Sequence, residues 1–239
     1  MQQVVQGIIL HSIRYSDSRF IVRIFCKTHG LKPFMVSAGS KNGSGVLQIL
    51  QPMNVVEFES SIRENQQIQT MRNIRIAHPL HQIYVDPVKS AMVMFLNEVL
   101  YKTMADDYVN DRFFQFLKNA VLLLDDSIDP RNFHLWCLLE ICRHYGFYPQ
   151  TDPDGSTEYF DLSQSIFCRH TPIHPFFIEK EEALHLYRIL ELEWPQMQDM
   201  QLHGTLRKNL LNALVRYIQL HLENQREIKS LEILHEVFH

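Results

Sequence analysis

The chain has 239 residues, of which 46% are hydrophobic and 21% are charged, as is typical of a folded globular protein. Its formal net charge of −4 does not by itself indicate a nucleic-acid-binding protein. Eight glycines exclude a collagen-like chain, and the longest apolar run, Ala91 to Leu96, is too short to cross a bilayer. Four cysteines do not suggest a disulfide scaffold, and the first residues do not resemble a signal peptide. We therefore expect a cytoplasmic protein with reduced cysteines and no membrane partner.

The charge is distributed unevenly along the chain. Residues 1–80 carry nine Lys or Arg against four Asp or Glu, a net charge of +5. The remaining residues carry 14 Lys or Arg against 23 Asp or Glu, a net charge of −9. Such an asymmetry indicates two units with different partners. We expect one domain over residues 1–80 and a second over residues 81–239.

The first domain is predicted to be a small β-barrel. Its five strand-like segments are rich in β-branched and aromatic residues: Val4–Ile13, Arg19–Cys26, Leu31–Ser37, Met53–Ser60 and Ile68–Ile76. The link His29-Gly30 is typical of a hairpin. Because closing a sheet removes its exposed edges, five short strands predict a closed barrel. An OB-like barrel fits the count, and an SH3-like barrel would give nearly the same pattern.

From about residue 80 the hydrophobic period becomes helical. Asp86-Pro87 is typical of an N-cap followed by the first helical position, and predicts a helix through Met104. Further helices are expected at about 110–124, 131–145, 180–193, 205–223 and 229–238. Prolines and glycines between 146 and 178 predict an irregular or short-stranded insertion. The expected fold class is α+β, a five-stranded OB-like barrel followed by an α-helical domain.

Sequence motifs of catalysis are absent. The chain has no GxGxxG, P-loop, G-x-S-x-G or H-E-x-x-H string, so we do not expect an enzyme or a cofactor. A zinc site stays open as a third hypothesis, because several cysteines and histidines flank the insertion: Cys142, His144, Cys168, His170 and His174. Among them only His170 and His174 have the spacing of a structural zinc pair, which favours core cysteines and surface histidines instead.

Basic and aromatic residues gather in the predicted barrel. Arg19, Arg23 and Lys27 fall on one face of the second strand with Phe25 between them, and Lys32 and Phe34 share a face of the third. Cations that follow phosphates and rings that stack on bases are what single-stranded nucleic acid binding requires. The alternative, which periodicity does not exclude, is that Phe25 and Phe34 fill the barrel core. Lys41 lies in the Gly/Ser-rich stretch Ala38 to Gly45, which could close over a backbone.

Several short motifs follow one another along the chain. They are Gly7-Ile8-Ile9-Leu10, Tyr15-Ser16-Asp17-Ser18-Arg19, Thr28-His29-Gly30, Leu47-Gln48-Ile49-Leu50-Gln51-Pro52, Leu206-Arg207-Lys208-Asn209-Leu210-Leu211 and Lys229-Ser230-Leu231-Glu232-Ile233-Leu234. Together they resemble the RecO family of bacterial DNA repair proteins. Gly146-Phe147-Tyr148-Pro149 and Phe160-Asp161-Leu162 are similar to members from the Bacteroidetes branch. Many family members carry a four-cysteine zinc module at this place. Residues 150–178 keep only Cys168, which argues against a metal here.

The resemblance implies an N-terminal OB-fold, a helical C-terminal domain and a recombination mediator without catalytic turnover. RecO-like proteins bind single- and double-stranded DNA, anneal complementary strands and help to load RecA on coated strands. The implied partners are DNA, the C-terminal tail of the single-stranded DNA-binding protein, and RecR, with RecF and RecA as further candidates. The candidate DNA-binding residues are Arg14, Arg19, Arg23, Lys27, Lys32, Phe34 and Lys41. The candidate peptide-binding residues are Phe113, Phe116, Leu117, Lys118, Arg131, Arg207 and Lys208.

A second hypothesis comes from a different class of protein. A helical protein–protein adaptor with a small supporting barrel would account for the acidic residues 81–239 without DNA binding. The two hypotheses differ in whether an oligonucleotide binds with the salt dependence of phosphate contacts.

Overall fold

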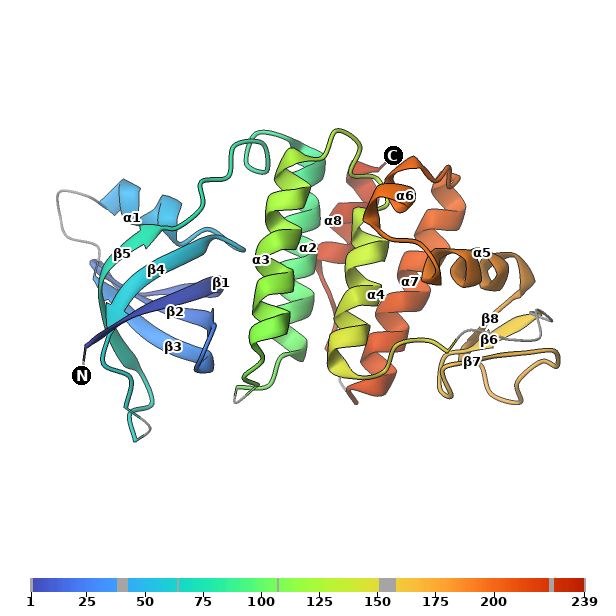
Figure 1. Cartoon of the computed structure of the whole chain (residues 1–239), viewed down its shortest axis with the longest axis horizontal. Helices are drawn as coiled ribbons and strands as arrows, with labels where there is room; N and C mark the ends of the chain where they lie inside the picture. The colour runs from blue at the N-terminus through green and yellow to red at the C-terminus, as the bar shows by residue number, and fades with distance from the viewer. Residues whose placement is uncertain are drawn as a thin grey trace. The chain divides into compact units, whose positions relative to one another are not determined.

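A computed structural model of the chain describes residues 2–37, 43–63, 65–106, 108–150, 158–223 and 226–238 (Figure 1). The chain divides into two compact units, Met1–Asp126 and Ser127–His239. The first unit therefore holds two long helices besides the barrel. The change from strands to helices falls between Ile76 and Pro87, whereas a domain boundary at residue 80 stays a prediction.

The first unit contains the expected barrel. Its strands are β1 (Gln3–Ser16), β2 (Arg19–Cys26), β3 (Gly30–Ser37), β4 (Val55–Ser60) and β5 (Gln69–Ile76). The sheet closes in the order β1-β2-β3-β5-β4, with β3 and β5 parallel and the other pairs antiparallel. This is a five-stranded OB-type barrel. The prediction of fold class and of the five strands is confirmed.

Strand β1 closes the barrel because it pairs with two neighbours. Residues Gln3–Ile8 pair with β4, and Gly7–Ser16 pair with β2, with register shifts after Ile9 and Arg14. Alternate residues of the strands point inward and form a buried cluster: Val5, Ile9, Val22, Ile24, Cys26, Phe34, Val36, Leu50, Val56, Phe58 and Met71. Within it, the rings of Phe34 and Phe58 meet edge to face at 4.9 Å.

Three helices complete the first unit: α1 (Gly43–Ile49), α2 (Pro87–Thr103) and α3 (Asp111–Asp126). Helix α1 was not expected, and its Ile49 packs against the barrel core. Asp86 caps α2 as predicted, since its carboxylate accepts hydrogen bonds from the Val88 and Lys89 amides. The Asn97 amide of α2 donates to the Leu10 carbonyl at 2.7 Å. Helix α2 is thereby fixed against the outside of β1.

The second unit is helical with a small sheet. Its helices are α4 (Phe133–Tyr145), α5 (Lys180–Leu190), α6 (Trp194–Asp199), α7 (Gly204–His221) and α8 (Ser230–Val237), and α6 was not expected. Helix α4 packs against α7 (Figure 1). The insertion forms a sheet of β6 (Tyr159–Asp161), β7 (Ile166–Cys168) and β8 (Phe177–Ile178) in the order β7-β6-β8. The Tyr217 hydroxyl of α7 is hydrogen-bonded in this region to Phe147 O, to which it donates, and to the Ser165 hydroxyl.

None of the helices among the described residues is both long enough and apolar enough to span a membrane.

Candidate nucleic-acid interface

The predicted stripe on β2 is largely covered by the first unit's own helices. Phe25 is fully buried, and its ring lies 5.9 Å from that of Phe113 on α3. Arg23 forms an ion pair with Asp106, and its side chain is 28% exposed. Lys27 Nζ lies 3.8 Å from Asp111 Oδ1. Arg23 and Lys27 therefore take part in intramolecular ion pairs, and their role in DNA binding stays a prediction.

Phe34 does not face solvent. Its side chain is 0% exposed and lies in the barrel core against Phe58. A ring enclosed in this way cannot stack on a base without opening the barrel, so the prediction for Phe34 is wrong. The alternative prediction, that both rings fill the barrel core, holds for Phe34. For Phe25 it is wrong, because this ring is buried outside the barrel core against Phe113 of α3.

An exposed cationic surface remains at the turn between β1 and β2. Here Arg14 and Tyr15 are 64% and 63% exposed, and Arg19 is also exposed. The register pairs Ser16 with Arg19, so the two arginines lie at the same end of the hairpin. Arg14 meets Asp17 at 3.4 Å, but an ion pair this exposed contributes little. We call Arg14, Tyr15 and Arg19 the hairpin tip.

Tyr15 was missing from the sequence-based candidates. Its exposed ring lies in the same turn as two exposed arginines, so a base can stack there while cations contact phosphates nearby. The available signal was an aromatic residue next to Arg14 in a polar turn. Periodicity directed attention to Phe25 and Phe34 instead, because they lie within stronger strands.

A groove opens at the other end of the β2–β3 hairpin. It has a volume of about 640 Å³ and lies between the start of β3 and the β4–β5 connection. Lys32, Arg63 and His29 line it together with Gln66 and Gln67. Burial, and then the charge of Lys32, lower the pKa of His29, so this imidazole is neutral near pH 7. The loop between strands 4 and 5 is one of the regions with which OB-folds hold oligonucleotides.

Lys41 lies outside the described residues, and its role stays a prediction.

The candidate peptide-binding residues are divided between the two units. Phe113 and Leu117 are fully buried, so the prediction that they line an open groove is wrong; Phe116 is half-buried beside Phe113, at 6.2 Å between ring centroids. These residues and the half-buried Lys118 belong to the first unit, while Arg131, Arg207 and Lys208 belong to the second.

The cations of the second unit differ in exposure. Arg131 pairs with Asp129, whose pKa is lowered by this hydrogen bond. Arg207 is buried and bonds Asn132 Oδ1 and Leu202 O. Lys208 is exposed.

The residues considered for zinc are placed apart or engaged elsewhere. Cys142 is buried in α4, and burial raises its pKa. His174 Nε2 lies 3.1 Å from Asp161 Oδ2 and from Ser163 Oγ. Over the described residues, no three His, Cys, Asp or Glu side chains come together as a metal site would require. The zinc hypothesis gains no support from this part of the chain.

A closed OB-type barrel with an exposed arginine hairpin, joined to a helical unit, places the protein in the OB-fold class. Comparison with known families is more specific: the profile for the recombination protein O N terminal matches residues 1–80, and that for the recombination protein O C terminal matches residues 84–232. The chain belongs to the RecO family. The resemblance inferred from its motifs is thus confirmed.

Relatives cover the chain from end to end. It is 31% identical over 243 residues to the DNA repair protein RecO of Flavobacterium psychrophilum, and the alignment covers 100% of both chains. The DNA repair proteins RecO of Bacteroides fragilis and Phocaeicola vulgatus are 31% and 30% identical, again over 100% of both chains. These similarities to Bacteroidetes proteins support a role in DNA repair.

Proposed function

We propose that this protein is a recombination mediator in DNA repair. It binds single- and double-stranded DNA, anneals complementary strands and helps to load RecA on strands coated by the single-stranded DNA-binding protein, without catalysing a covalent reaction. The observation that carries the proposal is the hairpin tip, where two arginines and a tyrosine are exposed in one turn of a barrel with net positive charge. Membership of the RecO family supports the same role.

A DNA strand can contact cations at both ends of the β2–β3 pair. Arg19 pairs with Ser37 at one end, and Lys32 pairs with Ile24 five residues away. At about 3.3 Å per residue the two cations are separated by roughly 17 Å along the strands. Five positions is an odd number, so the two side chains leave opposite faces of the sheet, and a nucleic-acid strand that contacts both has to pass around the end of the barrel where Lys32 lines the groove. Arg63, in the groove, extends the same cationic path.

Annealing follows from holding two strands on one surface. Cations that neutralise phosphates release counterions and lower the repulsion between strands. A second strand held nearby is present at a high effective concentration, which speeds pairing. Neither effect needs a nucleotide cofactor or a metal.

The partners proposed from the family are the C-terminal tail of the single-stranded DNA-binding protein, RecR, RecF and RecA. An acidic tail needs exposed cations, and Lys118, Arg131 and Lys208 are the candidates that reach the surface. With DNA as its substrate, the protein is proposed to act in the cytoplasm.

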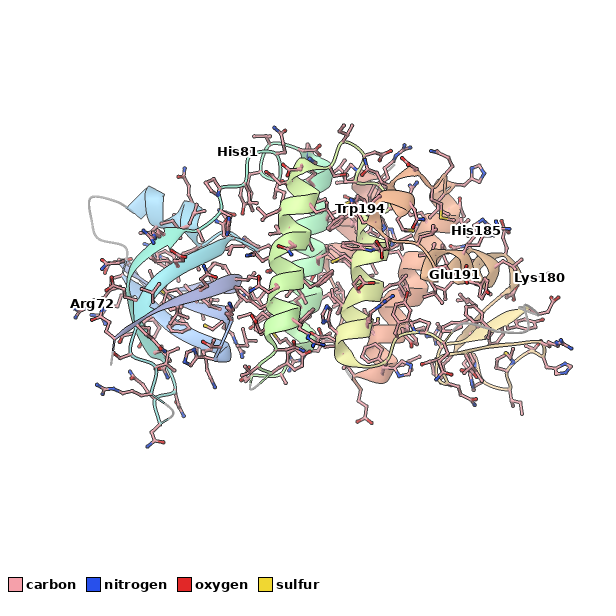
Figure 2. All side chains as sticks on the ribbon, in the orientation of Figure 1. Arg72, His81, Lys180, His185, Glu191 and Trp194 are labelled. Carbon is pink, nitrogen blue, oxygen red and sulfur yellow. The ribbon has the colours of Figure 1, made fainter. Side chains whose placement is uncertain are left out.

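The test is a salt titration of fluorescence anisotropy with a labelled single strand. Arg19→Glu should weaken binding and make the plot of log K against log salt shallower, by about 0.7 for each lost phosphate contact. The matched control is Arg72→Glu, which makes the same charge change at an exposed position of β5 (Figure 2). Equal slopes for wild type and Arg19→Glu would refute the assignment of the tip. An absence of salt-dependent binding would favour the adaptor hypothesis.

Strand annealing with and without the cognate single-stranded DNA-binding protein tests the mediator role. Acceleration on bare strands that is lost on coated strands would support DNA binding but contradict the proposed partner.

A further inference from the structure

A small pocket lies in the second unit between α4, α7 and α8. His134 of α4, Arg207 and Lys208 of α7, and His235 and Phe238 of the C-terminal region line it, together with Gly204 and Leu211. The space in which the centre of a water molecule can lie has a volume of about 20 Å³. One water needs roughly 10–15 Å³ by the same measure, so the pocket holds one or two atoms of that size.

The pocket contains a buried polar group without a partner. His134 is 0% exposed, and neither Nδ1 nor Nε2 makes a hydrogen bond with any described residue. Leaving a buried donor or acceptor unsatisfied costs about 1–3 kcal/mol. An imidazole that lines a cavity and keeps both nitrogens unpaired is placed to bond a group from outside the chain.

Positive charge surrounds this imidazole. Arg207 is 8% exposed, and its guanidinium donates to two neutral acceptors, Asn132 Oδ1 at 3.1 Å and Leu202 O at 2.7 Å. Asp129 is a carboxylate whose charge acts on Arg207, but its ion pair is with Arg131. Burial, followed by the charges of Arg207 and His235, lowers the pKa of His134 to about 3. Burial is the larger cause, and the two neighbouring charges add to it.

Two further features favour an anion. Gly204 begins α7, a helix of 18 residues, and the N-terminus of a long helix presents free amides and a positive dipole end. One wall of the pocket is apolar: the Phe238 ring lies 5.3 Å from the His134 ring and 5.6 Å from Arg207 Cζ. Such a wall limits hydration and strengthens the attraction between an anion and the cations.

We propose that this pocket binds a small carboxylate, whose two oxygens meet His134, Arg207 and Lys208. The volume suits two oxygens better than the four of a phosphate. Lys208 is exposed and supplies the charge at the mouth, while Arg207 and His134 lie inside. The pocket lies in the second unit and does not depend on the proposed DNA binding, but it shares Arg207 and Lys208 with the residues proposed for the acidic tail.

The experiment follows the histidine ring nitrogens by long-range 1H–15N NMR on the full chain, at constant ionic strength set with chloride. Acetate should shift the His134 signals to saturation, with an affinity in the millimolar range, on the order of 1 mM. Acetamide, which has nearly the same shape without the charge, should leave them unchanged. An equal response to both compounds, or none to acetate, would overturn the proposal.

Matched variants locate the site. Lys208→Gln should weaken acetate binding several-fold, because it removes the cation at the mouth while leaving the buried residues in place. Arg169→Gln removes the same charge from an exposed position in the same unit, outside the pocket, and should bind acetate like wild type. Equal weakening by the two variants would show a general charge effect and refute the site. Tighter binding of inorganic phosphate than of acetate would refute the assignment to a carboxylate.

Discussion

The rings of Phe25 on β2 and Phe113 on α3 lie with their centroids 5.9 Å apart, and both side chains are fully buried. Helix α3 therefore completes a hydrophobic core on the outside of the barrel. We expect Phe113→Ala to lower the free energy of unfolding by about 3–5 kcal/mol, as cavities left by buried aromatic residues do. Urea unfolding followed by circular dichroism measures the loss. Phe116→Ala, at a half-buried position, should cost clearly less; equal costs would contradict the buried contact.

Tyr15 should contribute to DNA affinity but not to stability. Its side chain is 63% exposed, and stacking on a base is worth about 1–3 kcal/mol. Tyr15→Ala should weaken single-strand binding by that amount in anisotropy titrations, with an unchanged unfolding midpoint. Tyr15→Phe keeps the ring and should bind like wild type. If both variants bound DNA as well as wild type, the hairpin tip would not stack a base.

Asp125 fixes the chain before α2. Its carboxylate accepts hydrogen bonds from the backbone amides of His81, Gln82 and Ile83 at 2.7–2.8 Å. Burial opposes the charge of Asp125, but these bonds and Lys89 outweigh burial and lower the pKa of the carboxyl group.

Because an asparagine offers only one acceptor oxygen, Asp125→Asn should leave at least one of these amides unpaired. The expected loss of stability is about 1.5–3 kcal/mol by urea unfolding. Asp126→Asn, at the exposed neighbouring position, is the control and should be nearly neutral. In wild type this contribution is present above the ordinary carboxyl pKa and disappears as the pH falls through the lowered one.

Gly30 begins β3 in a conformation that side chains rarely adopt. Its φ is +68°, and a Cβ there would lie 3.0 Å from the Tyr108 carbonyl oxygen and 3.2 Å from that of Asp106. Gly30→Ala should cost at least about 1–2 kcal/mol from backbone strain alone. Thermal unfolding measures the loss. A midpoint unchanged from wild type would mean that the hairpin and the segment after α2 adjust freely.

His134 should make stability depend on pH. Burial and the charges of Arg207 and His235 lower its folded pKa to about 3, while an unfolded histidine titrates near 6.5. The unfolded chain thus binds more protons between these values, and stability falls as the pH drops below about 6.5, by up to 1.4 kcal/mol per pH unit. His134→Phe should make the slope in urea titrations from pH 7 to pH 4 shallower by this amount, while His11, His29 and His144, whose pKa values are also lowered, keep their contributions. A slope as steep in the variant as in wild type would contradict the assignment.

The strands were predictable because alternation and turn residues are local signals. Arg19–Cys26 begins and ends as predicted, and the other strands differ by a few residues. Helix α6 was missed because six residues give too short a period to recognise, and α1 because it begins among Gly and Ser residues.

The binding face was only partly predictable. Alternation separates two faces of β2 but does not tell which one a distant segment covers. Phe113 follows Phe25 by 88 positions, and the pairing of Arg23 with Asp106 is equally remote. Exposure at Arg14, Tyr15 and Arg19 results from the hairpin's extension past the region covered by α2 and α3.

The pairing of Gln3 with Ser60 joins the first strand to the fourth, so residues far apart in the sequence close the barrel. During synthesis, β1 and β2 can form a hairpin early, but the first residues of β1, Gln3 to Gln6, have no neighbouring strand until β4 has left the ribosome. For that interval an apolar strand edge is open, and such edges pair readily with other chains. Long-range closure of this kind also slows folding. We therefore expect refolding yield to fall as protein concentration rises, with the loss arising in the barrel.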